Sequence, residues 1–167
     1  MHINQTHNYP HPLHSVFNLF ADSAFIEEKY TLLGARNIKI KKINLLDANL
    51  YVDSRREMPA SEDIPAVIKK FMGEWNRVRQ KEEWTQTTDG WYCQFSVDIL
   101  GVPVRISGTM SLRSTATGCE NSVFIDINTS IPFIGETLCR FVGQNAQRLA
   151  QQEFSIILSH LNESVVV

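Results

Sequence analysis

From about residue 74 to residue 132, apolar and polar residues alternate over one long stretch, and this stretch constrains the fold more than any other feature. Three turn signals divide it into strands: Asp89-Gly90, Gly101-Val102 and Ala116-Thr117. Strands joined by such short turns are antiparallel neighbours. We therefore expect a meander of four antiparallel strands in this part of the chain.

The registers that these turns impose agree with one another. The first hairpin pairs Trp84 with Phe95. The second then pairs Phe95 with Gly108, and the third pairs Gly108 with Ile125. Apolar residues fall on the same face in all three hairpins, whereas a slip of one residue would turn a whole strand over. The agreement predicts a sheet with one apolar face.

A helical pattern follows from Phe133 to His160. It is the longest helical pattern in the chain, and its apolar stripe predicts that it packs on the apolar face of the sheet. The stripe consists of Leu138, Phe141, Val142, Leu149, Ile156, Ile157 and Leu161.

The first half of the chain supplies the remaining elements. A strand at Ile3–Tyr9 precedes a helix that begins at Leu13 and a second helix that Asp22 can cap. Alternation resumes at Arg36 and continues past a turn near Asp47. The predicted fold class is α+β, with a curved antiparallel sheet of about seven strands wrapped around a long C-terminal helix (β-α-α-β6-α).

Composition narrows the class of protein. A length of 167 residues, with 43% hydrophobic and 20% charged residues, suits one globular domain spanning residues 1–167. The formal net charge of −2 argues against a nucleic-acid partner. The N-terminus lacks a signal-peptide pattern, the three cysteines suit a reducing compartment, and no apolar run is long enough for stable membrane insertion. We expect a cytoplasmic protein.

Several loose motifs follow one another in an order that resembles a known superfamily. The first combines Tyr9-Pro10, Val16-Phe17 and Asp22, and the second combines Ile64-Pro65, Lys70-Phe71, Gly73 and Trp84. Together with the order of elements, they resemble the START-like (SRPBCC, Bet v 1-like) helix-grip superfamily and its bacterial branch catalogued as domain of unknown function 2505. The resemblance implies a cavity between sheet and long helix, used elsewhere in the superfamily for lipids, sterols, hormones or polyketides. It transfers no catalytic residue, because the superfamily has no shared catalytic motif.

The apolar face of the sheet and the stripe of the helix supply the candidate cavity lining. The pattern alone favours a filled core, whereas the resemblance favours a ligand-sized gap. Gly108 also favours a gap, because it adds no side chain between Phe95 and Ile125. The predicted ligand-binding residues are Trp84, Trp91, Cys93, Phe95, Val97, Ile106, Gly108, Met110, Val123, Ile125, Ile127, Phe141 and Leu149.

Three polar residues share the inner face and are predicted to anchor a ligand head group: Arg56, Gln80 and Glu82. Because a buried carboxylate is costly without a partner, we expect Glu82 to have one, with Arg56 as the first candidate. In the alternative, these side chains sit at the open end of the sheet and meet water. Glu82 could also serve as a general base in a cyclase-like reaction.

The other reactive residues form no convincing constellation. His2, His7, His11 and His14 are expected at the surface, because they cannot easily converge as a metal site requires. Cys93 is expected to be buried and inert. The sequence contains no phosphate-binding glycine loop, nucleophile elbow or zinc-protease motif. We therefore predict no catalytic residue, no metal site and no cofactor.

A basic row with one aromatic residue alternates on the outer face of one predicted strand: Trp75, Arg77, Arg79 and Lys81. Such a row could contact nucleic acid or an anionic membrane. Nearby glutamates dilute its charge, so a solvated sheet face is the preferred interpretation.

The sequence thus predicts a module that binds, and could transport, a small apolar molecule or lipid. Two alternatives stay open: a polyketide cyclase/aromatase-like enzyme, and a protein–protein interaction module with a collapsed cavity. Neither the identity of the ligand nor the oligomeric state follows from the sequence.

Overall fold

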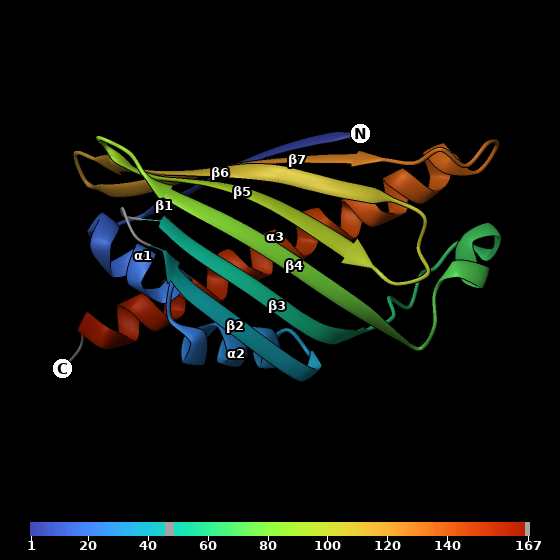
Figure 1. Cartoon of the computed structure of the whole chain (residues 1–167), viewed down its shortest axis with the longest axis horizontal. Helices are drawn as coiled ribbons and strands as arrows, with labels where there is room; N and C mark the ends of the chain where they lie inside the picture. The colour runs from blue at the N-terminus through green and yellow to red at the C-terminus, as the bar shows by residue number, and fades with distance from the viewer. Residues whose placement is uncertain (46–48, 166–167) are drawn as a thin grey trace.

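Seven antiparallel strands form one curved sheet in the computed structural model, which describes residues 1–45 and 49–165 (Figure 1). Their order across the sheet is β1-β7-β6-β5-β4-β3-β2. The N-terminal strand therefore lies beside the last one. The strands are β1 (His2–Tyr9), β2 (Arg36–Leu45), β3 (Asn49–Pro59), β4 (Trp75–Gln86), β5 (Gly90–Ile99), β6 (Arg105–Thr115) and β7 (Gly118–Asn128).

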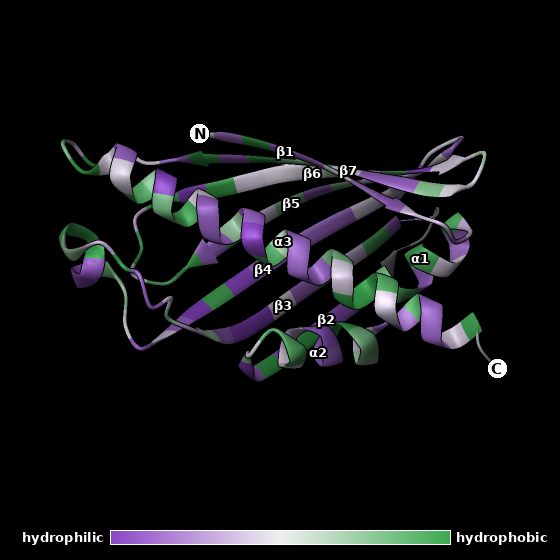
Figure 2. Cartoon of the chain, turned by 180° about the vertical axis from the view of Figure 1, so that it is seen from behind, coloured by the Kyte–Doolittle hydropathy of each residue, from purple (hydrophilic) through white to green (hydrophobic). Residues whose placement is uncertain are grey.

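The helices lie on one side of this sheet. Figure 2 shows the long C-terminal helix crossing the concave face, with two short helices beside its C-terminal half. The predicted α+β order with a long closing helix is confirmed. The elements are α1 (Leu13–Phe20), α2 (Ser23–Leu32), the short 3₁₀ helix η1 (Ala66–Phe71) and α3 (Gly135–Val165).

Local sequence signals explain where α2 begins and where the chain turns after it. The side-chain oxygen of Asp22 accepts hydrogen bonds from the backbone N–H groups of Ala24 and Phe25, at 2.9 and 3.5 Å. Gly34, with a φ of +88°, takes the left-handed conformation just beyond the helix. The turn predicted near Asp47 lies outside the described residues.

Two of the three predicted hairpin registers are confirmed. Phe95 pairs with Gly108, and Gly108 pairs with Ile125. The first register is wrong by two residues, because Trp84 pairs with Cys93 and not with Phe95. A slip of two residues keeps each side chain on its predicted face, so the prediction of an apolar inner face was unaffected.

The reason for this slip lies at Gly90. A Cβ atom at this position would lie 1.9 Å from the carbonyl oxygen of Leu112 on β6, so only glycine fits there. Gly90 is therefore part of the sheet and not of the turn. The backbone N–H of Thr87 donates to its carbonyl at 2.9 Å, which leaves Thr88-Asp89 as the central turn residues.

Two groups of buried residues hold α3 against the rest of the domain, one near each end. Leu138 and Val142, near its beginning, belong to a cluster with Ile127 of β7. Ile157 and Leu161, near its end, belong to a cluster with residues of α1 and α2. Between these groups the inward face of the helix carries the small residues Ala146 and Ala150 together with the larger Leu149 and Phe154.

Candidate functional site: a cavity between the sheet and the long helix

A cavity of about 750 Å³ lies between the concave face of the sheet and the middle of α3. Small-molecule sites typically measure roughly 300–1,000 Å³. Strands β1 and β3 to β7 contribute to the wall, together with α2, α3, Phe20 of α1 and the loop that follows β3. Exposed residues form its rim: Pro59, Glu62, Asp63, Gln144 and Arg148. The cavity is therefore not collapsed.

Most residues predicted for the site lie in the cavity wall. Phe95, Ile106 and Ile125 face α3, as the alternation of the hairpins requires. The three polar side chains predicted as anchors also line the cavity. The predicted residues found in its wall are Arg56, Gln80, Glu82, Trp84, Phe95, Val97, Ile106, Met110, Val123, Ile125, Phe141 and Leu149.

Four residues predicted to line the cavity do not reach it: Trp91, Cys93, Gly108 and Ile127. Trp91 stacks on Phe17, with ring centroids 3.8 Å apart and planes at 4°. Cys93 and Ile127 are fully buried among their neighbours. At Gly108 a Cβ atom would lie 2.5 Å from Cζ of Phe95, so the Phe95 ring occupies the space that we expected to be empty.

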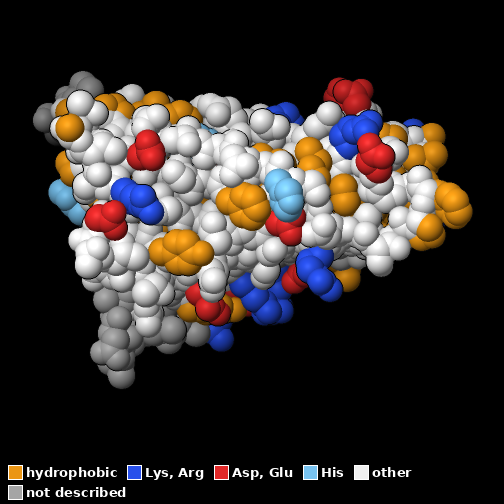
Figure 3. Space-filling view, turned by 90° about the horizontal axis from the view of Figure 1, so that it is seen from above, with side chains coloured by type: hydrophobic (Ala, Val, Ile, Leu, Met, Phe, Trp, Pro, Cys, Tyr) orange, Lys and Arg blue, Asp and Glu red, His pale blue; other side chains and the backbone are white. Residues whose placement is uncertain are grey.

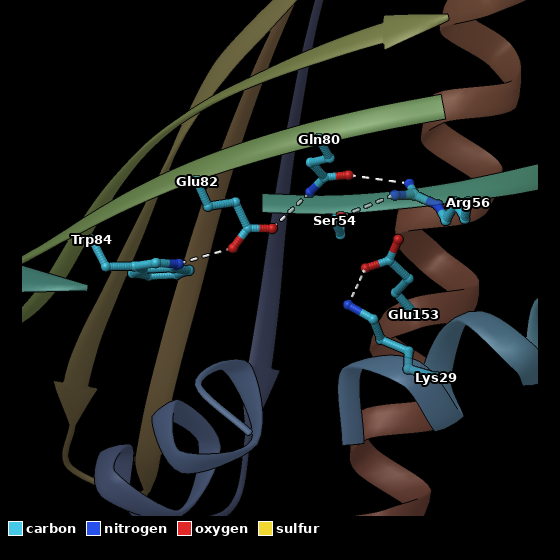
Figure 4. A network of polar contacts seen from close by, with 7 residues as sticks. All are labelled: Lys29, Ser54, Arg56, Gln80, Glu82, Trp84 and Glu153. Carbon is cyan, nitrogen blue, oxygen red and sulfur yellow. Dashed lines mark hydrogen bonds and ion pairs between the residues drawn. The ribbon is translucent and has the colours of Figure 1, made fainter. Parts of the chain in front are cut away.

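Glu82 is held in a chain of hydrogen bonds along the β4 wall (Figure 4). Its carboxylate accepts from the Gln80 amide at 2.7 Å and from the Trp84 indole at 2.9 Å. Arg56 donates to the other end of Gln80, at 3.2 Å, and does not touch Glu82. The expectation that Glu82 has a partner is confirmed, but the first candidate, Arg56, is wrong, because Gln80 lies between them and links the two charges.

Arg56 is only 8% exposed and is stabilised by neutral groups. Its guanidinium donates to the Ser54 hydroxyl at 3.3 Å and lies over the Tyr30 ring, 3.9 Å from the centroid. Its Nε is buried and has no hydrogen-bond partner among the described residues. A buried cation with an unused donor suits an acceptor group on a ligand.

A charge pair from two helices forms another part of the wall. Nζ of Lys29 on α2 lies 2.9 Å from a carboxylate oxygen of Glu153 on α3 (Figure 4). Burial is the largest single effect on the pKa of Lys29 and lowers it, but the combined effect of Glu153, Tyr30 and Glu82 outweighs burial, so the lysine pKa is raised. Sequence reasoning missed this pair, because the two residues lie 124 positions apart and meet only in the fold.

Two further polar residues lie in the wall: His7, which we expected at the surface, and Asn121, which the sequence analysis did not single out. They face each other across the β1–β7 pairing. His7 is 6% exposed and stacks on Phe154 of α3, with ring centroids 4.7 Å apart. The alternation that puts Ile3 and Tyr9 inside also puts His7 there, and this signal is present in the sequence.

The expectation that the early histidines lie at the surface is thus wrong for His7 and also for His11, which is 9% exposed. A ring nitrogen of His11 lies 2.8 Å from Oδ1 of Asn162 on α3, so the end of the helix covers it. Nδ1 of His2 lies 2.8 Å from a carboxylate oxygen of Asp126. Within residues 1–45 and 49–165, no three His, Cys, Asp or Glu side chains gather as a metal site would need.

Cys93, predicted to be buried and inert, is fully buried. Burial, together with the nearby charge of Glu82, raises the pKa of its thiol, which keeps it protonated. A protonated thiol is a poor nucleophile, so the structure gives Cys93 a packing role.

The basic row on the outer face of β4 is largely neutralised. Arg79 forms two hydrogen bonds with Asp53, at 2.6 and 3.1 Å. Arg77 lies 3.9 Å from Glu57, and Trp75 is covered by the guanidinium of Arg36. On the face drawn in Figure 3, basic side chains are likewise scattered among acidic and apolar ones. These features match a solvated sheet face, not a nucleic-acid interface.

No helix within the described part of the chain is long and apolar enough to cross a membrane.

The strand order, the crossing helix and the cavity between them define a helix-grip fold. TTHA0849 from Thermus thermophilus shares this fold with a TM-score of 0.63, 18% identity and coverage of 96% of this chain and 99% of that one. The Zhui aromatase/cyclase from Streptomyces sp. R1128 shares it with a TM-score of 0.67 and 11% identity, and the match covers 99% of this chain and 95% of that one. Ara h 8.0201 shares it with a TM-score of 0.61 and 14% identity, and the match covers 95% of this chain and 98% of that one. Identities this low establish the fold alone.

Within this class, the chain belongs to the family described as protein of unknown function (DUF2505), whose model matches residues 4–161. The family predicted from the order of motifs is confirmed. A sequence search of curated proteins finds no match.

Proposed function

We propose that the chain binds a small hydrophobic ligand or lipid in the cavity between the sheet and α3. The observation that carries the proposal is the cavity of about 750 Å³, which most of the inner face lines with apolar side chains. Apolar walls with a few polar groups are the usual design of a small-molecule site. Arg56, Gln80 and Glu82 supply polar anchors inside it.

The proposal is tested with N-phenyl-1-naphthylamine, an uncharged probe that fluoresces more strongly in apolar surroundings. We expect saturable binding to the wild-type protein. Ala150→Trp places a large side chain in the cavity wall and should abolish the signal. The matched control is Ala24→Trp at an exposed position of α2, which should bind the probe like the wild type. Equal binding by the two variants, or no binding by any protein, would contradict the proposal.

A second candidate is a cyclase-like enzyme, favoured by the Glu82 carboxylate in the cavity wall. A carboxylate held beside a bound polyketide could move protons as a general base. Glu82→Gln should then abolish turnover of a candidate polyketide while leaving probe binding intact. The Zhui aromatase/cyclase has the same fold, but at 11% identity it supplies no residue for this role. We therefore place binding ahead of catalysis.

A further inference from the structure

The cavity contains a pair of buried polar side chains, away from Arg56, for which the proposed function has no use. His7 of β1 and Asn121 of β7 are direct neighbours across the sheet, and both line the cavity. They are 6% and 3% exposed. Both belong to the inward-facing sets of their strands, so they cannot turn toward solvent without breaking the alternation.

Each of these side chains has an unused hydrogen-bonding atom. Nε2 of His7 and Oδ1 of Asn121 are buried and have no partner among the described residues. Buried polar groups are nearly always satisfied, because leaving one unpaired costs free energy. Two such atoms, on paired residues that both line the cavity, indicate that a third group completes them.

The chemistry of the pair selects that third group. Asn121 Oδ1 accepts a hydrogen bond, so its partner must donate. Burial lowers the pKa of His7 against the opposing effect of the Glu153 charge, so the imidazole is neutral at neutral pH and its Nε2 donates or accepts. A hydroxyl both donates and accepts, so one hydroxyl can serve both atoms. A ligand carbonyl oxygen could serve only His7.

A charged group fits this position poorly. Phe154 covers the His7 ring, and the apolar side chains of Val123 and Ile157 also line the cavity. The nearby carboxylate of Glu153 is already paired with Lys29. An ionised ligand group would lose its hydration here without gaining an opposite charge.

We propose that His7 and Asn121 form a recognition point for a hydroxyl group, and that the ligand is a hydroxylated hydrophobic molecule. This inference rests on the proposed function, because it names the class of ligand that the same cavity accepts. His7 and Asn121 are binding residues in this proposal and take no part in a reaction.

Matched probes test the inference on the wild-type protein. Biphenyl, 4-phenylphenol and 4-methoxybiphenyl share one apolar body, and only the phenol can both donate and accept. Each compound is titrated against bound N-phenyl-1-naphthylamine. We expect 4-phenylphenol to displace the probe at a concentration about tenfold lower than biphenyl, as one satisfied buried hydrogen-bonding pair implies. The methoxy compound, which cannot donate to Asn121, should behave like biphenyl.

Variants locate the effect. Asn121→Leu and His7→Phe should remove most of the preference for the phenol while retaining the affinity for biphenyl. Asn4→Leu, on the outward side of β1, is the matched control and should keep the full preference. Replacing an unsatisfied buried group with an apolar one is neutral or stabilising, so both cavity variants should fold with an undiminished melting temperature.

The outcomes separate the two proposals. If biphenyl and 4-phenylphenol displace the probe equally well from the wild type, a water molecule satisfies the pair and the hydroxyl inference is overturned while ligand binding stands. A preference that survives in both cavity variants overturns it too, since the hydroxyl then binds elsewhere. If neither compound nor the probe binds, the proposed function fails together with the inference that rests on it.

Discussion

At the scale of single residues, position in a strand decides whether a polar side chain at the cavity is buried, even where the residue type is more often exposed. The expectation that His7 lies at the surface came from the failure of the early histidines to converge on a metal site, and it was wrong. Position in the strand decides instead, since β1 turns every second residue toward α3. Asn121 occupies the matching position on β7. Both placements could be predicted from periodicity, whereas their lack of partners could not.

Burial of His7 predicts a pH dependence of stability. Because its folded-state pKa is below the usual value of 6.5, the folded protein binds fewer protons than the unfolded chain below that pH. Stability should therefore be full above about pH 6.5 and fall as the pH drops toward the folded-state pKa. We expect the urea midpoint of the wild type to fall between pH 7 and pH 5, and that of His7→Phe to fall less.

The carboxylates whose pKa values are lowered, Asp53 and Glu57, have usual values of 3.8 and 4.5 and act at lower pH. Protonation of these two carboxylates therefore changes the urea midpoint at a lower pH than protonation of His7 does. The same loss between pH 7 and pH 5 in the wild type and in His7→Phe would rule out the proposed cost of protonating His7.

At the scale of elements, what could be predicted depends on whether neighbours in sequence are neighbours in space. The β5–β6 and β6–β7 registers followed from short turns between alternating strands. The β4–β5 register failed because Asp89-Gly90 is a strong turn signal, yet Gly90 is required inside the sheet by its contact with β6. That contact is made with Leu112, on another strand, so local sequence could not reveal it.

The contact between α2 and α3 is a second feature that local sequence hides, and it carries a stability prediction. Glu153→Gln would leave Lys29 as an unpaired cation whose side chain is only 12% exposed. We expect a loss of about 2 kcal/mol in the free energy of unfolding, less than for a fully buried pair because Glu153 is partly exposed. Urea denaturation of the wild type and of Glu153→Gln at pH 7 measures this loss in the free energy of unfolding.

The matched control is Glu136→Gln, which removes the exposed partner of Arg140 within α3. Exposed pairs of this kind contribute roughly 0.5 kcal/mol or less. Equal losses in the two variants would show that the contact between α2 and α3 contributes no more than a surface ion pair.

At the scale of the whole molecule, α3 is held at both ends, and the cavity lies between its middle and the sheet. A ligand that binds the folded chain and not the unfolded chain must stabilise it. At a free probe concentration about 100 times the Kd, the gain should be about 2.7 kcal/mol. We expect N-phenyl-1-naphthylamine to raise the melting temperature of the wild type, measured by circular dichroism, and to leave that of Ala150→Trp unchanged.

Because α3 is attached at its two ends, the residues that keep the domain folded are in part distinct from those that line the cavity. Leu138 and Leu161 anchor the helix without lining the cavity, whereas Ala146, Leu149 and Ala150 line it between those two anchors. Exchanges at these three lining positions can therefore reshape the chamber at little cost to the scaffold. Single substitutions at these positions could therefore change which small molecule the domain prefers, without a second mutation that restores stability.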